Sequence, residues 1–338
     1  MKVGIPRALF YYNFFPLWKT FYEELGCEII LSPKTNKEIL DLGIKACVDE
    51  ACLPIKVFHG HVESIKDKVD FLFIPRNTSL SYSEFTCPKI CGLPEMIIHS
   101  IKDLPKVVTP DFNLYHRRID LDRTIQDMSE PLGIDLSRAK NAYRKALREQ
   151  EIYRQHLLEG FLPEEALFNH RMNSGGNGSH RMNRGNILVL SHPYNLYDSF
   201  INMDLIHKVK KMGYRLFTVE EMEPQKINMY ANQLEKRMFW TFGRELIGAG
   251  LCAIEEEFRW DGMIFLSSFA CGLDSIIADF IERKIRRKGT LPFMQLFIDE
   301  HTGEAGIDTR IEAFIEMIER RRDYGGNLSP YGECVYRS

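Results

Sequence analysis

The stretch KVGIP at residues 2–6, the aromatic-rich stretch at residues 14–25 and the stretch EIILS at residues 28–32 decide the fold class of this chain. Two short apolar runs flank a segment with helical spacing, so the sequence predicts strand, helix and strand within residues 2–32. Strands joined by a helix of this length pair in parallel through a right-handed crossover. The chain therefore opens as an α/β layer structure.

The same order recurs along the whole chain. In the first half, a helix at residues 54–66 and strands at residues 70–75 and 107–109 continue it. After Gly185 it returns, with strands at 186–191, 214–219, 262–267 and 293–299 and helices at 202–212, within 233–257, at 274–287 and at 309–321. We expect an α/β protein with two doubly wound, Rossmann- or flavodoxin-like parallel-sheet domains that face a cleft.

A charged helix is predicted between the two halves, at residues 136–158. Its residues near helical spacing are Ala139, Tyr143, Ala146, Ile152 and Leu157. We expect this helix to brace one domain against the other or against a second subunit. Residues 169–184 are rich in Gly, Asn, Ser and His and show no periodicity, which is typical of a mobile insertion. The expected division is an N-terminal domain at 1–115, a linker helix with the insertion at 116–185, and a C-terminal domain at 186–338.

Composition restricts the partners of the chain. Its 338 residues carry a formal net charge of −3, which disfavours a nucleic-acid protein held by phosphate neutralisation. No segment approaches the roughly 18 apolar residues of a membrane span, and the N-terminus lacks the apolar core of a signal peptide. We expect a cytoplasmic protein. In that reducing compartment its eight cysteines are expected to serve packing, metal binding or redox chemistry.

Five of the cysteines lie in three short stretches at predicted strand or helix ends. The stretches are CVDEAC at residues 47–52, CPKIC at residues 87–91 and CG at residues 271–272. Cys52 precedes Pro54, and proline favours the first helical turn, so the helix dipole would stabilise a thiolate there. Cys271 occupies the equivalent place in the second half. We expect both to line one cleft, with Cys87 within reach of the same edge.

The remaining cysteines have a plainer interpretation. Cys27, Cys252 and Cys334 are expected to be small apolar residues of a core or a tail. Position favours a ligand role for Cys47, Cys52, Cys87 and Cys271, because Pro, Gly or acidic loop residues flank them. Cys91 is intermediate: it can supply a further ligand or simply end a short helical turn. The spacing is not that of a zinc ribbon, which needs two Cys-x-x-Cys knuckles.

Longer motifs extend over nearly the whole chain: VGIPR at 3–7, CVDEACLPIKVFHGHV at 47–62, FIPR at 73–76, CPK at 87–89, GLPE at 92–95, SHPYNLYD at 191–198, FACGLDS at 269–275 and DEHTGEAG at 299–306. Together they resemble the acyl-CoA dehydratase activase-related family. That family is allied to the 2-hydroxyacyl-CoA dehydratase and benzoyl-CoA reductase subunits and to the double-cubane cluster proteins. Leu273 departs from it, since related chains often carry proline there.

The resemblance implies an iron–sulfur cluster between paired α/β domains. By motif match, Cys47, Cys52, Cys87 and Cys271 would hold one [4Fe-4S] cluster; an [8Fe-9S] double-cubane cluster with Cys91 also ligating is the alternative. The chain has no Gly-x-x-x-x-Gly-Lys-Ser/Thr loop. We therefore expect it to be the anaerobic partner that accepts low-potential electrons from an ATP-dependent activase, and not the ATPase.

Polar side chains near the motifs are candidates to support the cluster or the reaction. They are Glu50, Lys56, His61, Glu95, His301 and Glu304. Glu304 follows a strand end and is the preferred acid or base, with His301 and His61 as further catalytic candidates. His59 and His61 lie two apart on a predicted helix, so only one is expected to face the cluster.

Three functions stay open. The chain could use or relay electrons for reduction of a small substrate. It could be an acyl-CoA dehydratase-like enzyme subunit, with the cluster as Lewis acid and electron donor to an acyl-CoA substrate. It could also be a non-catalytic zinc or scaffold protein that uses the same thiols structurally. A homodimer is compatible with all three.

Overall fold

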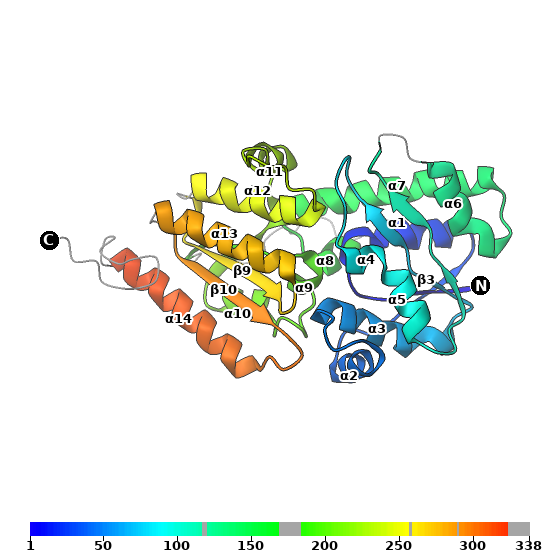
Figure 1. The fold of residues 1–338 in the computed structure, drawn as a ribbon, viewed down its shortest axis with the longest axis horizontal. Coiled ribbons are helices and arrows are strands. Elements are labelled where there is room, and N and C mark those ends of the chain that lie inside the picture. The colour runs from blue at the N-terminus through cyan, green and yellow to red at the C-terminus, as the bar shows by residue number, and fades with distance from the viewer. Residues whose placement is uncertain (117–119, 169–183, 257–258, 289–290, 324–338) are drawn as a thin grey trace. The chain divides into compact units, whose positions relative to one another are not determined.

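The computed structural model describes residues 1–116, 120–168, 184–256, 259–288 and 291–323, which form two compact units (Figure 1). The first unit comprises Met1–Leu157, Phe161–Phe168 and Phe239–Thr241, and the second holds the remaining described residues. Each unit contains a four-stranded parallel sheet. The predicted α/β class with two parallel-sheet domains is confirmed.

The first sheet has the order β2-β1-β3-β5. Its strands are β1 (Lys2–Ile5), β2 (Glu28–Leu31), β3 (Phe71–Phe73) and β5 (Lys106–Val108). Val3 lies in register with Ile29 of β2 and with Phe71 of β3. Since β2 and β3 flank β1 on opposite sides, the chain reverses its direction of winding between β1 and β3.

Helices cover both faces of the first sheet. On one face lies α1 (Tyr11–Glu24), whose Trp18 and Tyr22 rings stand 5.4 and 5.3 Å from the Phe73 ring. On the other face lies α3 (Leu53–Ile65). There α3 packs closely on β1, because a Cβ added at Gly4 would lie 3.2 Å from the Ile65 side chain.

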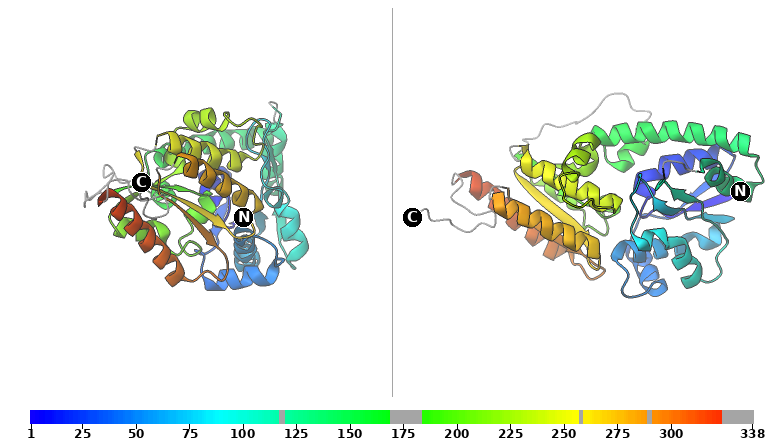
Figure 2. Two further views of the ribbon diagram at one scale, coloured as in Figure 1. Left: turned by 60° about the vertical axis from the view of Figure 1, so that its left-hand side comes forward. Right: turned by 45° about the horizontal axis from the view of Figure 1, so that its top comes forward.

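The predicted charged helix is α7 (Leu136–Leu158), and it lies along α1 (Figure 2). The Tyr153 hydroxyl donates a 2.6 Å hydrogen bond to the Tyr12 carbonyl, and the Gln150 amide donates one of 2.7 Å to the Asn13 carbonyl. Of the residues near helical spacing, Ile152 is exposed, and its neighbour Tyr153 is buried. A tyrosine suits this contact between α7 and α1, because its hydroxyl reaches a backbone acceptor while its ring packs.

Two prolines interrupt neighbouring strands of the first unit. A proline cannot donate to the ladder, so β3 stops before Pro75 and β5 stops before Pro110. The pairing resumes after them as β4 (Arg76–Ser79) and β6 (Asp111–Asn113). The strand predicted at residues 70–75 is therefore shorter than expected.

The second sheet has the order β10-β9-β7-β8. Its strands are β7 (Gly185–Leu190), β8 (Tyr214–Thr218), β9 (Gly262–Ser268) and β10 (Phe293–Ile298). The chain runs from β7 to β8 on one side and then crosses to β9 on the other. This is the winding of the first sheet, so the reversal falls between β7 and β9.

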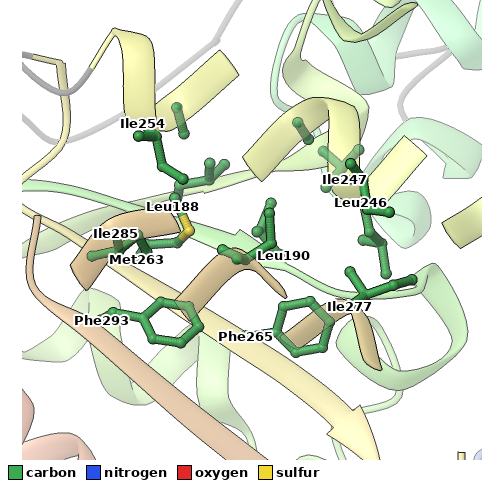
Figure 3. Close-up of a cluster of buried hydrophobic side chains, with 14 of the residues drawn as sticks. Leu188, Leu190, Leu246, Ile247, Ile254, Met263, Phe265, Ile277, Ile285 and Phe293 are labelled. Carbon is green, nitrogen blue, oxygen red and sulfur yellow. The ribbon is translucent and has the colours of Figure 1, made fainter. Parts of the chain in front are cut away.

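The core of the second unit explains the position of its helices. Leu190 of β7 and Phe265 of β9 belong to a buried cluster with residues of α12 (Thr241–Glu255) and α13 (Gly272–Lys288), such as Leu246 and Ile277 (Figure 3). The opposite face of β9 meets α14 (Glu304–Asp323), because a Cβ added at Gly262 would lie 2.7 Å from Phe314. Both faces of the sheet are thus covered.

Shorter elements complete the described part. They are α2 (Lys37–Ala46), α4 (Pro88–Cys91), α5 (Leu93–Ser100), α6 (Leu121–Ser129), α8 (Pro163–Phe168), α9 (Pro193–Leu196), α10 (Leu205–Lys211), α11 (Pro224–Ala231), η1 (Lys66–Lys68), η2 (Glu130–Leu132) and η4 (Val219–Glu221). Residues 169–183 of the expected insertion lie outside the described residues. Among the described helices, none combines the length and the apolar character needed to cross a membrane.

Candidate functional site

The first cysteine loop joins two helices whose backbones touch. A Cβ added at Gly43 of α2 would lie 1.9 Å from the Lys56 carbonyl oxygen, and one added at Gly60 of α3 would lie 1.9 Å from the Ile39 carbonyl oxygen. Only glycine permits this approach. The close packing fixes the loop that connects the helices.

Two cysteines lie at the two ends of that loop. Cys47 follows the last residue of α2, and Cys52 caps the N-terminus of α3 with Pro54 in its first turn, as the sequence predicted. Between them the Ala51 amide donates a 3.1 Å hydrogen bond to the Val48 carbonyl, which closes a turn. Both thiols are half-buried. A thiolate at Cys52 would lie at the positive end of the α3 dipole.

The second cysteine loop lies against the first. Cys87 caps α4, and Cys91 is its last residue. The Lys89 ammonium donates a 3.0 Å hydrogen bond to the Glu50 carbonyl of the first loop. Cys91 Sγ lies 3.6 Å from Thr78 Oγ1 of β4. Four half-buried thiols of the first unit thus belong to two neighbouring loops.

Cations stand beside these thiols. Lys56 on α3 is only 3% exposed, which is rare for lysine unless an anion or hydrogen bonds compensate its charge. Burial raises the pKa of the Cys47 thiol, while the Val48 amide and the charges of Lys56 and Lys89 act in the opposite direction. The Val48 amide and the two lysines therefore favour the thiolate form of Cys47 more than burial alone would.

Cys271 belongs to the second unit. It stands directly before α13 and follows Ala270, whose φ of +65° lies in the left-handed region. Its amide donates to the Ser268 carbonyl, and its carbonyl accepts from the Ser275 amide, each at 3.1 Å. Cys271 therefore sits at a helix N-terminus, as the sequence predicted.

No three Cys, His, Asp or Glu side chains within the described ranges gather closely enough to hold a metal ion. The thiols themselves are ligands of the type that iron–sulfur clusters take. A helix N-terminus at Cys52 and the buried charge of Lys56 suit the negative charge of such a group. The donor chemistry therefore fits a cluster, although the loops would have to draw together around it.

The histidines of α3 are both buried. His61 Nδ1 lies 2.8 Å from Ser32 Oγ and its Nε2 lies 3.0 Å from Thr35 Oγ1, so both ring nitrogens have partners. Burial, with Arg7 nearby, lowers the pKa of His61 to about 3. His59 Nδ1 lies 2.8 Å from the Ile55 carbonyl. In this geometry His61 holds the chain after β2 against α3 as a neutral ring.

The other polar candidates lie at the surface. Glu304 begins α14 and forms a 2.8 Å ion pair with Lys208 of α10, and His301 is exposed. Glu50 is exposed, and its backbone carbonyl rather than its carboxylate takes part in the cysteine loops. Glu95 accepts a hydrogen bond from Arg76, which lowers the pKa of that carboxyl.

The structure adds a polar group that the sequence analysis did not single out. His192 follows β7 and its Nε2 lies 2.8 Å from Asp274 Oδ1 in the first turn of α13. Both side chains are buried. The motifs SHPYNLYD and FACGLDS contain the two residues, but a separation of 82 positions hides the contact.

Cysteines outside these loops agree with the plainer interpretation. Cys252 is buried in α12, and burial raises the pKa of its thiol to about 11. Burial likewise raises the pKa of Cys27. Cys334 lies outside the described residues.

Two family models match the chain. The model described as the CoA enzyme activase uncharacterised domain (DUF2229) matches residues 2–222. The chain belongs to this family. A second model, 2-hydroxyglutaryl-CoA dehydratase, D-component, matches residues 212–318. The predicted activase-related and dehydratase-like resemblance is confirmed. No curated protein matches the chain.

Proposed function

We propose that this protein is an iron–sulfur protein of the 2-hydroxyacyl-CoA dehydratase-like class. It accepts low-potential electrons from an ATP-dependent activase and uses or relays them for the reduction of a small substrate. The observation that carries the proposal is the pair of cysteine loops at residues 47–52 and 87–91, which the contact from Lys89 to the Glu50 carbonyl joins. The two family matches support the class of protein.

The residues proposed to hold the cluster are Cys47, Cys52, Cys87 and Cys271, with Cys91 as the further thiol of a larger cluster. When bound, a [4Fe-4S] cluster supplies one-electron transfer, and an iron without a thiolate can act as a Lewis acid. The helix N-terminus at Cys52 offers amide hydrogen bonds to sulfur, and such bonds raise the reduction potential. The buried ammonium of Lys56 acts in the same direction.

Metal analysis after anaerobic purification tests the proposal. Iron and acid-labile sulfide in comparable amounts, with broad absorbance near 400 nm, are expected. Single substitutions Cys47→Ser, Cys52→Ser and Cys87→Ser should each lower iron content, while Cys252→Ser, a buried thiol away from the loops, should not. Stoichiometric zinc without iron would overturn the proposal and favour a protein that uses the same thiols for structural zinc.

Substitution of Cys271 and Cys91 then separates two arrangements of ligands. Loss of iron in Cys271→Ser, with retention in Cys91→Ser, is expected if a cluster joins the units. The reverse result would confine the cluster to the first unit, where both cysteine loops lie.

A dehydratase-like enzyme subunit remains the second candidate, because the match to the D-component covers residues 212–318. The two candidates differ in what they require from acyl-CoA. An isolated electron carrier should be reduced by an ATP-dependent activase without acyl-CoA and should not alter 2-hydroxyacyl-CoA. Turnover of 2-hydroxyacyl-CoA by the reduced protein would favour the dehydratase.

A further inference from the structure

The second sheet ends on one side at β10, and no further strand lies beside it among the described residues. Its sequence, FMQLFI, contains neither a charged residue nor a proline, and it is the longest edge strand of the two four-stranded sheets. The other three edge strands each carry an exposed charged residue: Glu28 in β2, Lys106 in β5 and Arg215 in β8. Short length and charges protect an edge from pairing with another chain. β10 has neither protection.

The pairing of β10 with β9 determines which of its backbone groups point outward. The Phe269 amide donates a 2.8 Å hydrogen bond to the Ile298 carbonyl, so the backbone groups of Ile298 face β9. Successive residues of a strand direct these groups to opposite sides, so the N–H and C=O of Phe293, Gln295 and Phe297 point away from β9. Within the described ranges these outward groups have no hydrogen-bond partner. Phe293 is only 5% exposed, and backbone groups with little access to water are rarely left unpaired.

The outward groups are complementary to a second copy of themselves. In an antiparallel pair around a two-fold axis at Gln295, Phe297 lies opposite Phe293 of the partner subunit, and Gln295 lies opposite its own copy. Residues opposite each other in this register exchange both backbone hydrogen bonds, so every outward N–H and C=O gains a partner. Phe297 is 38% exposed, and two aromatic side chains opposite each other on neighbouring strands stabilise a sheet. The same register therefore covers the exposed ring.

The charges of α13 are complementary around the same axis. Gln295 Nε2 donates a 2.6 Å hydrogen bond to Glu282 Oε2, which places the middle of α13 beside the middle of β10. A two-fold axis there makes the two copies of α13 antiparallel. Asp279 and Arg286 precede and follow Glu282 by nearly equal distances along the helix, and both are exposed. The acid of one copy therefore lies on the side of the base of the other, which favours this pairing.

We propose that the outer edge of β10 binds a second copy of this chain. The two β10 strands pair antiparallel around a two-fold axis at Gln295 and join the two four-stranded sheets into one. An uncharged strand suits its own copy, because no like charges meet and no charge is left without a partner. β10 contains none of the cysteines proposed to hold the cluster, so the interface is independent of that proposal.

Sedimentation equilibrium of the full chain over a range of concentrations tests the interface. The expected mass is twice that of the chain and falls to the single mass on dilution. Gln295→Pro removes the N–H at the axis but none of the bonds to β9, and an edge strand tolerates proline. Because the dimer loses two hydrogen bonds, its dissociation constant should rise about tenfold or more. A monomer at every concentration would leave the edge to a different partner and would overturn the proposal.

A pair of lysine substitutions separates the edge from exposed apolar surface in general. Phe297→Lys places a charge on the outer strand and should also raise the dissociation constant about tenfold or more. Ile276→Lys is the matched control: Ile276 is more exposed, at 68%, but lies six residues from Glu282 and so on a different side of α13. It should leave the dimer unchanged. Circular dichroism confirms that each variant is folded. Equal effects of the two lysines, or no effect of either, would overturn the assignment of β10.

Charge reversal on α13 tests the two-fold register. Asp279→Arg and Arg286→Asp should each weaken the dimer, because like charges then meet across the axis. The double variant restores opposite charges and should recover most of the affinity. A dimer that is no tighter in the double variant than in the single variants would overturn the antiparallel register at Gln295.

Discussion

The two sheets share one winding order but differ at their carboxyl edges. Next to β1 and β3 of the first sheet stand Arg7 and Arg76, which pair with Glu164 and Glu95 on partly exposed side chains. Next to β7 and β9 of the second sheet stands the buried pair of His192 and Asp274. The fold determines where chemistry can be placed, and the residues after each strand determine its kind.

The approach of α2 to α3 gives a large expected difference between the units. Gly43→Ala places a Cβ 1.9 Å from the Lys56 carbonyl oxygen, so the helices must separate. We expect a loss of about 3 kcal/mol in the free energy of unfolding, as for other overpacked or strained sites, and lower iron content. Denaturant unfolding of the purified chain measures the first and metal analysis the second.

Gly306→Ala on α14 is the matched control in the second unit. A Cβ there meets nothing within 4 Å, so alanine should raise stability by about 0.5–1 kcal/mol through helix propensity. Equal effects of the two substitutions would contradict the packing argument.

The acid–base pairs at the two edges give the next effect. Asp274→Ala leaves His192 buried without its carboxylate, and breaking such pairs costs about 3–5 kcal/mol. Glu95→Ala opens a partly exposed pair with Arg76, for which about 0–1 kcal/mol is expected. Chemical denaturation at neutral pH checks both values. Similar costs would show that burial does not distinguish these edges.

The sequence predicts the strands of the two four-stranded sheets and the long helices, because their apolar periodicity is regular; β4 and β6 were not predicted. α2 escaped prediction: its apolar face is short, and only the Asn36 side chain, which accepts a 3.0 Å bond from the Ile39 amide, marks its start. The helix α14 begins at Glu304 rather than at residue 309, because the polar turn before it continues directly into the helix.

The candidate site was predictable only in part. The positions of Cys52, Cys87 and Cys271 at helix N-termini follow from local Pro and Gly signals. The contact from Lys89 to the Glu50 carbonyl and the pair of His192 with Asp274 depend on tertiary packing between distant segments. No local pattern in a single sequence contains that information.

Two buried histidines should give opposite dependences of stability on pH. The pKa of His61 is lowered to about 3, so the unfolded chain binds the proton more tightly and stability falls as pH drops below the ordinary value near 6.5. The pKa of His192 is raised, so its contribution is present below the ordinary value and is lost as pH rises through the folded value.

Denaturant unfolding between pH 4 and pH 8 tests this contrast through two variants. The stability difference between the natural chain and His61→Gln should shrink on acidification, by at most about 1.4 kcal/mol per pH unit. The difference for His192→Gln should shrink on alkalinisation. Parallel profiles for the two variants would contradict the opposite shifts.

Backbone strain at two strand-to-helix turns gives the most local test of the comparison. Leu9 after β1 has a φ of +51° and Ala270 after β9 has a φ of +65°, a region that costs a residue with a Cβ about 1–2 kcal/mol. Ala270→Gly relieves that cost and loses only a methyl group, while glycine's extra freedom in the unfolded chain offsets part of the gain. We expect a net gain of about 0.5–1 kcal/mol.

Leu9→Gly relieves similar strain but removes a side chain that is 2% exposed, so burial outweighs strain and the variant should lose about 2 kcal/mol or more. Thermal and denaturant unfolding of both variants measure the contrast. A loss of stability in Ala270→Gly would mean that the turn before Cys271 is not strained.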